Sequence, residues 1–279
     1  MQELIVLNPD ELDQDPAIGM NLAVSLGIGH LEIRTAYGSN ALMLNDDQLR
    51  QVRRLADERQ LTVAALASPL WKWCLPEAVP GKVDSFGFPS RVARGKRESW
   101  VERALTVAEI LGTRRIRVFS HLRVADGPTE TFRNDPLLPT ALKQAERAGM
   151  RLLLENEPVC TVAEPAPLLE VLRTHTGLGL WLDLGNLHEV GHGTADAVRA
   201  LAPYAEYVHV KDYRLSPDGT KQFVPAGAGS VPYKDLLAVL HRVRPGLPYA
   251  LETHVRNTPA DALTRGTAYV RSVLRGGPA

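Results

Sequence analysis

The sequence has 279 residues, and its 32 Lys and Arg balance 32 Asp and Glu, so the formal charge at neutral pH is zero. This balance argues against a polyanionic partner such as nucleic acid. Hydrophobic residues make up 44% and charged residues 23% of the chain, which excludes disordered and collagen-like classes. The length allows either one large domain or two ordinary ones.

Cysteine content and apolar runs bear on the compartment. Cys74 and Cys160 are the only cysteines, and they are too far apart for a zinc knuckle or a C-x-x-C redox pair, so we expect reduced thiols. Residues 1–7 carry no basic region and are soon followed by acidic residues, and no apolar run approaches about 18 residues. We therefore expect a cytoplasmic protein with neither a signal peptide nor a membrane span.

Short apolar runs rich in Val, Ile and Leu alternate with longer segments of helical period along the whole chain. The predicted strands are, in chain order, Leu4–Asn8, His30–Thr35, Thr62–Ala67, Arg115–Ser120, Arg151–Asn156, Gly179–Leu184, Tyr207–Lys211 and Tyr249–His254. The predicted helices are Pro16–Leu26, Asp46–Glu58, Glu98–Leu111, Pro136–Ala148, Ala166–Thr174, Ala195–Ala202, Tyr233–Val243 and Pro259–Leu274.

Eight strand-then-helix cycles predict parallel strands joined by right-handed crossovers, which can close into a (β/α)8 TIM barrel. The length is then explained by a single domain over residues 1–279. An open doubly wound sheet is the alternative, but it would require a Gly-rich phosphate turn after the first strand. The sequence there is Asn8-Pro9-Asp10-Glu11. Residues 68–97 are predicted to form a long loop after the third strand, and its aromatic residues favour a lid.

Four polar residues stand at the ends of four successive predicted strands. They are Glu155, Asp183, His209 and Glu252. In a barrel these ends meet at one mouth, and a carboxylate there must be paired, hydrogen-bonded or bound to a metal. Three carboxylates and one imidazole suit one divalent cation, namely Mn²⁺, Mg²⁺, Co²⁺ or Zn²⁺.

Other residues near the same ends are candidates for substrate contacts. They are Glu32, Trp71, His121, Glu157, Asn186, His188, Lys211 and Arg256. For some of them a structural role is equally open: Glu32 could form an ion pair with Arg34, and Lys211 and Asp212 could orient His209. Trp71 could form an apolar wall against a sugar face together with the other aromatic residues of its loop.

The strand-end set resembles the xylose-isomerase-like superfamily of sugar isomerases and epimerases, which also contains dehydratases and apurinic endonucleases. The resemblance rests on Leu-Leu-Glu-Asn-Glu-Pro at 153–158, Trp-Leu-Asp-Leu-Gly-Asn at 181–186, Val-His-Val-Lys-Asp at 208–212, Pro-Ala-Gly-Ala-Gly-Ser at 225–230 and Leu-Glu-Thr-His at 251–254. It implies that Glu155, Asp183, His209 and Glu252 are the metal ligands. Asn186 stands where many members have a histidine, and the further histidines of the endonucleases are absent, which argues against DNA repair.

The resemblance and the ligand set together predict a metal-dependent isomerase or epimerase acting on a ketose or polyol-like compound. A cation that chelates adjacent oxygens stabilises an enediolate, and Glu155 and Glu252 would transfer the proton from opposite faces. A dehydratase of the inosose or dehydroshikimate type is the alternative, and a sugar-binding barrel without catalysis is another. We expect a small carbohydrate-like, unphosphorylated substrate and no nucleic-acid or membrane partner. The outer helices could support a homodimer.

Overall fold

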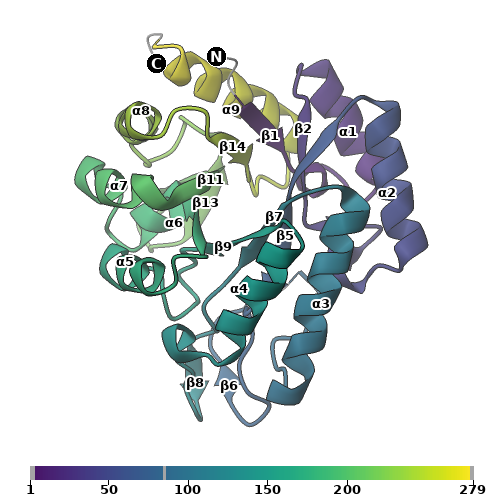
Figure 1. Ribbon diagram of the computed structural model, residues 1–279. Helices are drawn as coiled ribbons and strands as arrows, with labels where there is room; N and C mark the ends of the chain where they lie inside the picture. The colour runs from purple at the N-terminus through teal and green to yellow at the C-terminus, as the bar shows by residue number, and fades with distance from the viewer. Residues whose placement is uncertain (1–3, 84–85, 277–279) are drawn as a thin grey trace.

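The computed structural model describes residues 4–83 and 86–276, and within them eight strands close into a barrel (Figure 1). Around the barrel the order is β1, β14, β11, β10, β9, β7, β5 and β2, and every pairing is parallel. The barrel strands are β1 (Leu4–Leu7), β2 (His30–Ile33), β5 (Thr62–Leu70), β7 (Arg115–Val118), β9 (Arg151–Glu155), β10 (Gly179–Asp183), β11 (Ala205–Val210) and β14 (Pro248–Leu251). The predicted TIM barrel is confirmed.

Helices cover the outside of the barrel (Figure 1). The α-helices are α1 (Pro16–Ser25), α2 (Asp46–Glu58), α3 (Arg94–Leu111), α4 (Leu137–Arg147), α5 (Pro165–Thr174), α6 (Leu184–Glu189), α7 (Ala195–Leu201), α8 (Tyr233–Val243) and α9 (Pro259–Leu274). The 3₁₀ turns are η1 (Pro9–Glu11), η2 (Ala41–Met43), η3 (Phe132–Asn134) and η4 (Ala202–Tyr204). Three two-stranded sheets lie in the loops that follow the barrel strands. They are β3 (Thr35–Ala36) with β4 (Ser39–Asn40), β6 (Val79–Pro80) with β8 (Val124–Asp126), and β12 (Asp212–Leu215) with β13 (Lys221–Val224).

Local sequence signals explain where several helices begin and end. A capping box opens α2, because the Asn45 side chain accepts from the backbone of Gln48 and the Gln48 side chain accepts from the backbone of Asn45. Asp15 caps α1 ahead of Pro16, a residue suited to the first helical position. Gly112 ends α3 in the left-handed conformation that a glycine adopts without strain. These boundaries agree with the predicted ones.

Strand register aligns two of the four strand-end residues, whereas Glu155 on β9 lies opposite Trp181, two residues before Asp183. Asp183 on β10 pairs in register with His209 on β11, and His209 in turn is opposite Ala250 on β14. Below this level the interior is filled by apolar side chains, among them Trp181 and Tyr207. The Trp181 ring lies edge to face against His209, with the centroids 5.0 Å apart. The barrel core therefore closes directly beneath the strand-end site.

The predicted loop over residues 68–97 is shortened at both ends, and its interpretation as an aromatic lid is wrong for three of its four aromatic residues, whereas Phe86 lines the cavity at the barrel mouth. Strand β5 continues through Leu70, and α3 begins at Arg94 instead of Glu98. Trp71, Trp73 and Phe88 are buried within the core, because their indole and phenyl rings pack against one another rather than over the mouth. Residues 84 and 85 of this segment, like residues 1–3 and 277–279 of the predicted domain, lie outside the described part of the chain.

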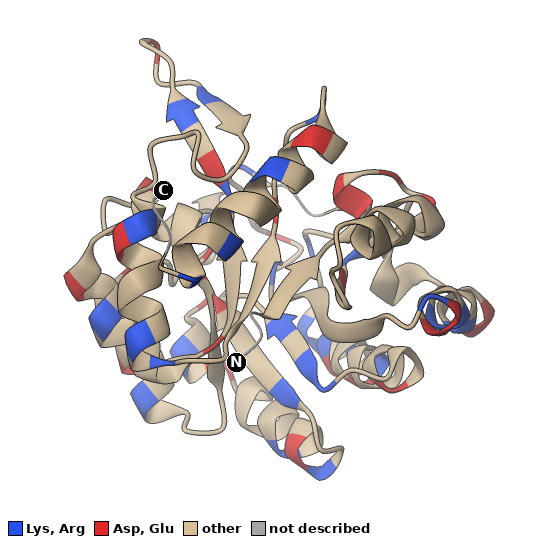
Figure 2. Cartoon of the chain, turned by 90° about the horizontal axis from the view of Figure 1, so that it is seen from above, with Lys and Arg blue, Asp and Glu red and all other residues tan. Residues whose placement is uncertain are grey.

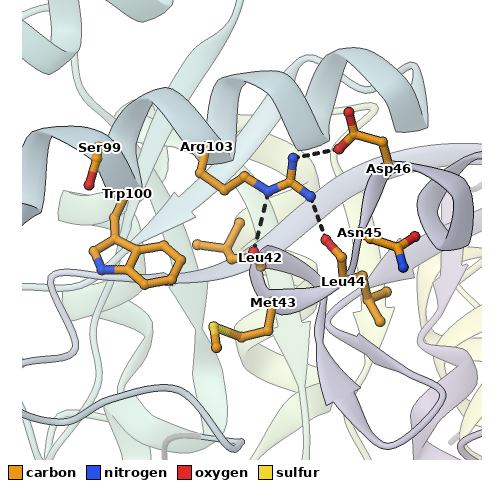
Figure 3. A pocket seen from close by; sticks show the side chains of 8 residues that line it. All are labelled: Leu42, Met43, Leu44, Asn45, Asp46, Ser99, Trp100 and Arg103. Atoms are coloured by element: carbon orange, nitrogen blue, oxygen red, sulfur yellow. Dashed lines mark hydrogen bonds and ion pairs between the residues drawn. The ribbon is translucent and has the colours of Figure 1, made fainter.

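Charge on the outer surface is mixed. Figure 2 shows basic and acidic residues interspersed over the helices that surround the barrel, as the balanced composition leads one to expect. A groove between η2 and α3 is bridged by Arg103, which donates to the carbonyls of Leu42 and Leu44 and pairs with Asp46 (Figure 3). These contacts tie α3 to the segment before α2. Over residues 4–83 and 86–276, no helix is both long and apolar enough to cross a membrane.

Candidate metal centre

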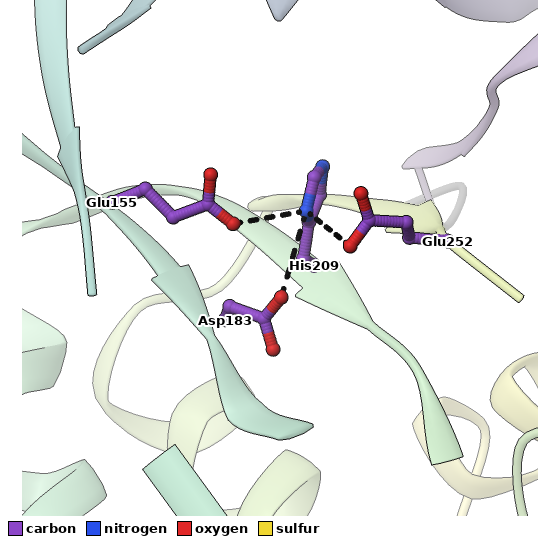
Figure 4. A group of neighbouring side chains, drawn as sticks. All are labelled: Glu155, Asp183, His209 and Glu252. Atoms are coloured by element: carbon purple, nitrogen blue, oxygen red, sulfur yellow. Dashed lines mark ion pairs between the residues drawn. The ribbon is translucent and has the colours of Figure 1, made fainter. Parts of the chain in front are cut away.

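Four side chains converge at the mouth of the barrel, one from the end of each of four neighbouring strands. They are Glu155, Asp183, His209 and Glu252, all buried. Figure 4 shows His209 between Glu155 and Glu252, with Asp183 beside them. The Nδ1 atom of His209 lies 3.4 Å from Glu155 Oε1, 3.7 Å from Asp183 Oδ2 and 3.4 Å from Glu252 Oε2. The structure therefore brings together all four residues that the sequence singled out.

Two of the candidate ligands, His209 and Asp183, are oriented by contacts to the atoms that face away from the centre. Glu32 Oε2 lies 2.8 Å from His209 Nε2, so a neutral imidazole that donates from Nε2 keeps a lone pair on Nδ1. Asp183 Oδ1 accepts from the backbone N–H of Asn186 at 2.8 Å, in the first turn of α6. The side chain of Asn156 bonds both backbone groups of Asp183. The inward atoms, His209 Nδ1 and Asp183 Oδ2, are left to face the centre.

The two glutamates are held in the same way by arginines. Arg117 Nη1 lies 3.0 Å from Glu155 Oε2, and Arg34 Nη1 lies 2.6 Å from Glu252 Oε1. Arg117 is itself fixed by hydrogen bonds to the carbonyls of β5, and Arg34 by the carboxylates of η1. Each glutamate therefore presents its second oxygen, Oε1 of Glu155 and Oε2 of Glu252, to the centre.

The residues present fit a divalent cation. The four inward atoms lie within 4.8 Å of one another, and ligands about 2.1 Å from one ion lie at most about 4.2 Å apart, so small adjustments suffice. Buried polar atoms are almost always satisfied, yet His209 Nδ1 makes no hydrogen bond to the described residues, and Asp183 Oδ2 has only ion pairs, the closer one with Lys211. Three carboxylate oxygens and one imidazole nitrogen are also the donor set that such ions accept. The centre thus has the geometry, the donors and the unmet bonding capacity of a metal site.

Electrostatic coupling across the cluster is strong. Burial lowers the pKa of His209, but the carboxylates of Glu32 and Glu252 outweigh it and raise that pKa well above the usual range. Burial likewise opposes charge on Glu252, whereas Lys211 and His209 hold its pKa well below the usual range. The Glu252 carboxylate therefore stays ionised at neutral pH, whereas His209 is protonated in the metal-free protein and a cation bound at Nδ1 would displace that proton.

A cavity of about 680 Å³ opens beside the centre, between the hairpin of β12 and β13 and the segment after β6. Of the predicted substrate contacts, Glu157, Asn186, Lys211 and Arg256 line it, as does Glu252. The Nζ of Lys211 lies 2.9 Å from Asp183 Oδ2 and 3.1 Å from Glu252 Oε2. The close approach of Lys211 to α6 depends on Gly185, where a Cβ atom would lie 2.7 Å from the lysine side chain.

The other predicted substrate contacts do not line this cavity. Glu32 lies behind His209, and the indole of buried Trp71 donates to Asp135. His121 bonds the same carboxylate at 2.7 Å, and His188 bonds the hydroxyl of Tyr213. Glu32 and Trp71 thus have structural roles, whereas contact of His121 or His188 with a substrate stays a prediction.

The expected pairings of Glu32 and Asp212 are also wrong. Arg34 pairs with Asp10, Glu11 and Glu252, not with Glu32. Asp212 does not orient His209; its carboxylate accepts from the backbone N–H groups of Gly227, Gly229 and Val231 and fixes the loop after β13. Glu32 orients His209 instead.

Sequence reasoning missed two residues of this site altogether. Arg117 follows the same rule as the ligands, because it is a charged residue facing inward from the apolar strand β7, and that rule could have found it. Lys72 lines the cavity just beyond the end of β5, but it lies in a segment that the sequence pattern assigned to a loop.

Comparison with known proteins places the chain in a family. The model that describes the xylose isomerase-like TIM barrel matches residues 20–273. The chain belongs to this family. No curated protein sequence gives a significant match. The four candidate ligands, which lie between Glu155 and Glu252, all fall within the residues that the family model matches.

Solved structures share this fold at low sequence identity. The IOLI protein with a bound zinc atom has a TM-score of 0.75 at 15% identity, and the alignment covers 99% of both chains. The probable 3-DHS dehydratase AsbF of Bacillus anthracis has a TM-score of 0.73 at 16% identity, covering 97% of this chain and 99% of that one. The D-psicose 3-epimerase of Clostridium cellulolyticum H10, with D-tagatose, has a TM-score of 0.73 at 14% identity with the same coverage. An epimerase and a probable dehydratase are thus both built on this barrel.

Proposed function

We propose that this protein is a divalent-metal-dependent isomerase or epimerase that acts on a small hydroxy-carbonyl compound of the sugar type. The observation that carries the proposal is the convergence of four ligand atoms at the mouth, each on a residue whose outward atom is already held by another group. Such preorganisation serves an ion that is bound repeatedly in one geometry. A sugar-binding barrel without catalysis would have no use for it.

The two glutamates are the proton-transfer groups of this proposal. A divalent cation bound there would draw electron density from a carbonyl oxygen and an adjacent hydroxyl oxygen, and would acidify the hydroxyl-bearing carbon next to the carbonyl group. Glu252 lines the cavity and, with Oε1 fixed by Arg34, presents Oε2 to a compound bound there. Glu155 lies across His209 from it (Figure 4). Removal of the proton by one glutamate and delivery of a second proton, already carried by the other glutamate, would invert the carbon. Return of the removed proton by the same glutamate to the neighbouring carbon would move the carbonyl group.

Lys211 supports a second candidate, a dehydratase. Burial opposes its charge, but Asp183 and Glu252 raise the pKa of Lys211 well above the usual range, so the ammonium stays protonated. Its Nζ lies at the cavity wall beside Glu252, where it can hydrogen-bond an oxygen that gains negative charge. If the compound carries a hydroxyl group in the β position, the Lys211 ammonium could donate a proton to it. The hydroxyl would then leave as water after Glu252 has taken the proton from carbon.

The experiment follows the shared first step. Free ketoses, keto-inositols and dehydroshikimate are incubated in deuterated water with protein that has been stripped by a chelator and reloaded with Mn²⁺. We expect deuterium at the carbon beside the carbonyl only with the metal-loaded protein, and a loss of at least about 100-fold in Glu252→Gln. Glu206→Gln is the matched control, because Glu206 lies on β11 but pairs with Arg151 at the far end of the strand. Equal exchange in Glu252→Gln and in the control would end the two-glutamate mechanism.

A further inference from the structure

We propose that the compound bound at the barrel mouth carries an oxyanion, a carboxylate or a phosphate, that pairs with Lys72. This inference rests on the function proposed above and names the substrate class of the same site. The sequence favoured a neutral polyol because no basic cluster follows the seventh and eighth strands. The structure adds cations from elsewhere in the barrel to the same cavity.

Among the described residues, the wall of the cavity carries more positive than negative side chains. Its cations are Lys72, Lys82, Arg117, Lys211, Lys221 and Arg256, and its carboxylates are Glu157, Glu189 and Glu252. Three of the cations have close partners: Arg117 faces Glu155, Lys211 faces Asp183 and Glu252, and Lys221 pairs with Glu189. The remaining cations are Lys72, Lys82 and Arg256.

Lys72 differs from the other two because it is buried. Its side chain is 5% exposed, whereas Lys82 and Arg256 stand exposed at the rim. The one carboxylate that pairs with Lys72 in the described part of the chain is Glu157, with 3.7 Å between Nζ and Oε2, which is too long for a hydrogen bond. A buried ammonium normally has close anionic partners. Lys72 therefore has bonding capacity left for an anion within the cavity.

The position of Lys72 suits the far end of a compound held at the metal centre. Its Nζ lies 4.7 Å from the centre of the Phe119 ring, and the guanidinium of Arg117 lies 4.7 Å from the same ring. Since Arg117 pairs with Glu155, Phe119 links the metal centre to Lys72 along the β5, β7 and β9 side of the mouth. Glu252 and Arg256 approach from β14 on the other side. A bound compound would thus extend from the centre toward Lys72.

Both aromatic neighbours fix the ammonium without neutralising it. Phe119 is buried and Phe86 half-buried, and Lys72 Nζ lies within cation–π range of both rings. Aromatic faces orient a cation but leave its N–H groups free to donate to an oxyanion. Other buried carboxylates near the barrel mouth are paired with other cations. Asp10 and Glu11 pair with Arg34, and Glu32 pairs with His209.

The test compares three ketoses that differ only at the terminal carbon: D-fructose, D-fructuronate and D-fructose 6-phosphate. Binding to the Mn²⁺-loaded protein is measured by calorimetry, so the result does not depend on turnover. We expect the better of the two anions to bind at least 10-fold more tightly than fructose, because a charge-assisted hydrogen bond in a buried site has about that effect. Comparison of carboxylate with phosphate identifies the oxyanion.

Variants locate the effect. Lys72→Met should abolish the preference for the anion, whereas Lys72→Arg and the exposed control Lys143→Met on α4 should keep it. Glu157→Gln removes the carboxylate that competes for Lys72 and should tighten binding of the anion alone, a gain that misfolding cannot produce. A preference that is lost in Arg256→Gln instead would place the anion at the rim and overturn the assignment.

Two further results would also overturn the inference: fructose binding as tightly as both anions, or no binding of either anion. Deuterium exchange on the same compounds keeps this result separate from the proposed function. Anion preference without exchange would leave the oxyanion site standing and remove the isomerase, whereas exchange of fructose without anion preference would do the reverse.

Discussion

Glu32 allows the metal centre to be tested without touching a ligand. Its Oε2 lies 2.8 Å from His209 Nε2, and both side chains are fully buried. Loss of such a partner typically weakens metal binding by about 10-fold to 100-fold, or about 1.4 to 2.7 kcal/mol. Glu32→Gln keeps an acceptor for the imidazole but removes the charge, so we expect about 10-fold. Glu32→Ala also leaves the Asn8 amide without its bond to Oε1, and we expect about 100-fold.

Metal affinity is measured by titrating chelator-stripped protein with Mn²⁺ and following the free ion by electron paramagnetic resonance. Glu206→Gln again serves as the control, since it removes a carboxylate from the same strand without approaching His209. Circular dichroism establishes that each variant is folded. If both Glu32 variants bind Mn²⁺ within twofold of the wild-type protein, His209 Nδ1 is not a ligand oriented by Glu32 and the assigned centre is wrong.

Two more predictions concern stability. Mn²⁺ at 100 times its dissociation constant should add about 2.7 kcal/mol to the free energy of unfolding, and with an unfolding entropy of about 2.1 cal/mol/K per residue the melting temperature should rise by roughly 5 °C. An unchanged melting temperature would contradict the site. In the second prediction, Asp135→Asn lowers stability at pH 7 by about 1.5 to 3 kcal/mol, the range for hydrogen bonds to a charged group. Burial raises the pKa of Asp135, but hydrogen bonds from His121, Leu137 and Trp71 outweigh it and hold the pKa below its usual value. This stability is therefore present above the unfolded pKa of about 3.9 and lost as the pH falls through the folded pKa. Urea unfolding from pH 6 to pH 3 should show a shallower decline in the variant, and parallel declines would refute the assignment.

The barrel and the four candidate ligands could be predicted because both depend on local pattern. A parallel strand covered on both faces is a short apolar run, so a charged residue at its end, such as Asp183 or Glu252, stands out in the sequence. Barrel topology then brings such ends together whatever their separation along the chain. The candidate ligands can therefore be predicted without knowing which side chains contact one another.

The groups that hold the ligands could not be predicted in the same way. Arg34 and Glu252 are 218 residues apart, and they meet only because β1 and β2 close the barrel against β14. Composition also misled, because the tryptophans after β5 look like a mobile aromatic lid in the sequence. Their burial depends on partners such as Phe132 and Asp135, which come from segments far along the chain.

The supporting residues explain why a cluster of like charges is tolerated at the centre of this barrel. Arg34 and Arg117 approach the glutamates from outside and bind the oxygens that face away from the centre. Lys211 alone of these supporting cations reaches inward oxygens, Asp183 Oδ2 and Glu252 Oε2, so a bound ion would have to displace its ammonium from them. Because buried carboxylates that are only partly compensated lower stability, the arrangement is costly for a protein that needs only a stable fold. A divalent cation bound there would offset that cost, so the same geometry that destabilises the metal-free cluster would strengthen metal binding.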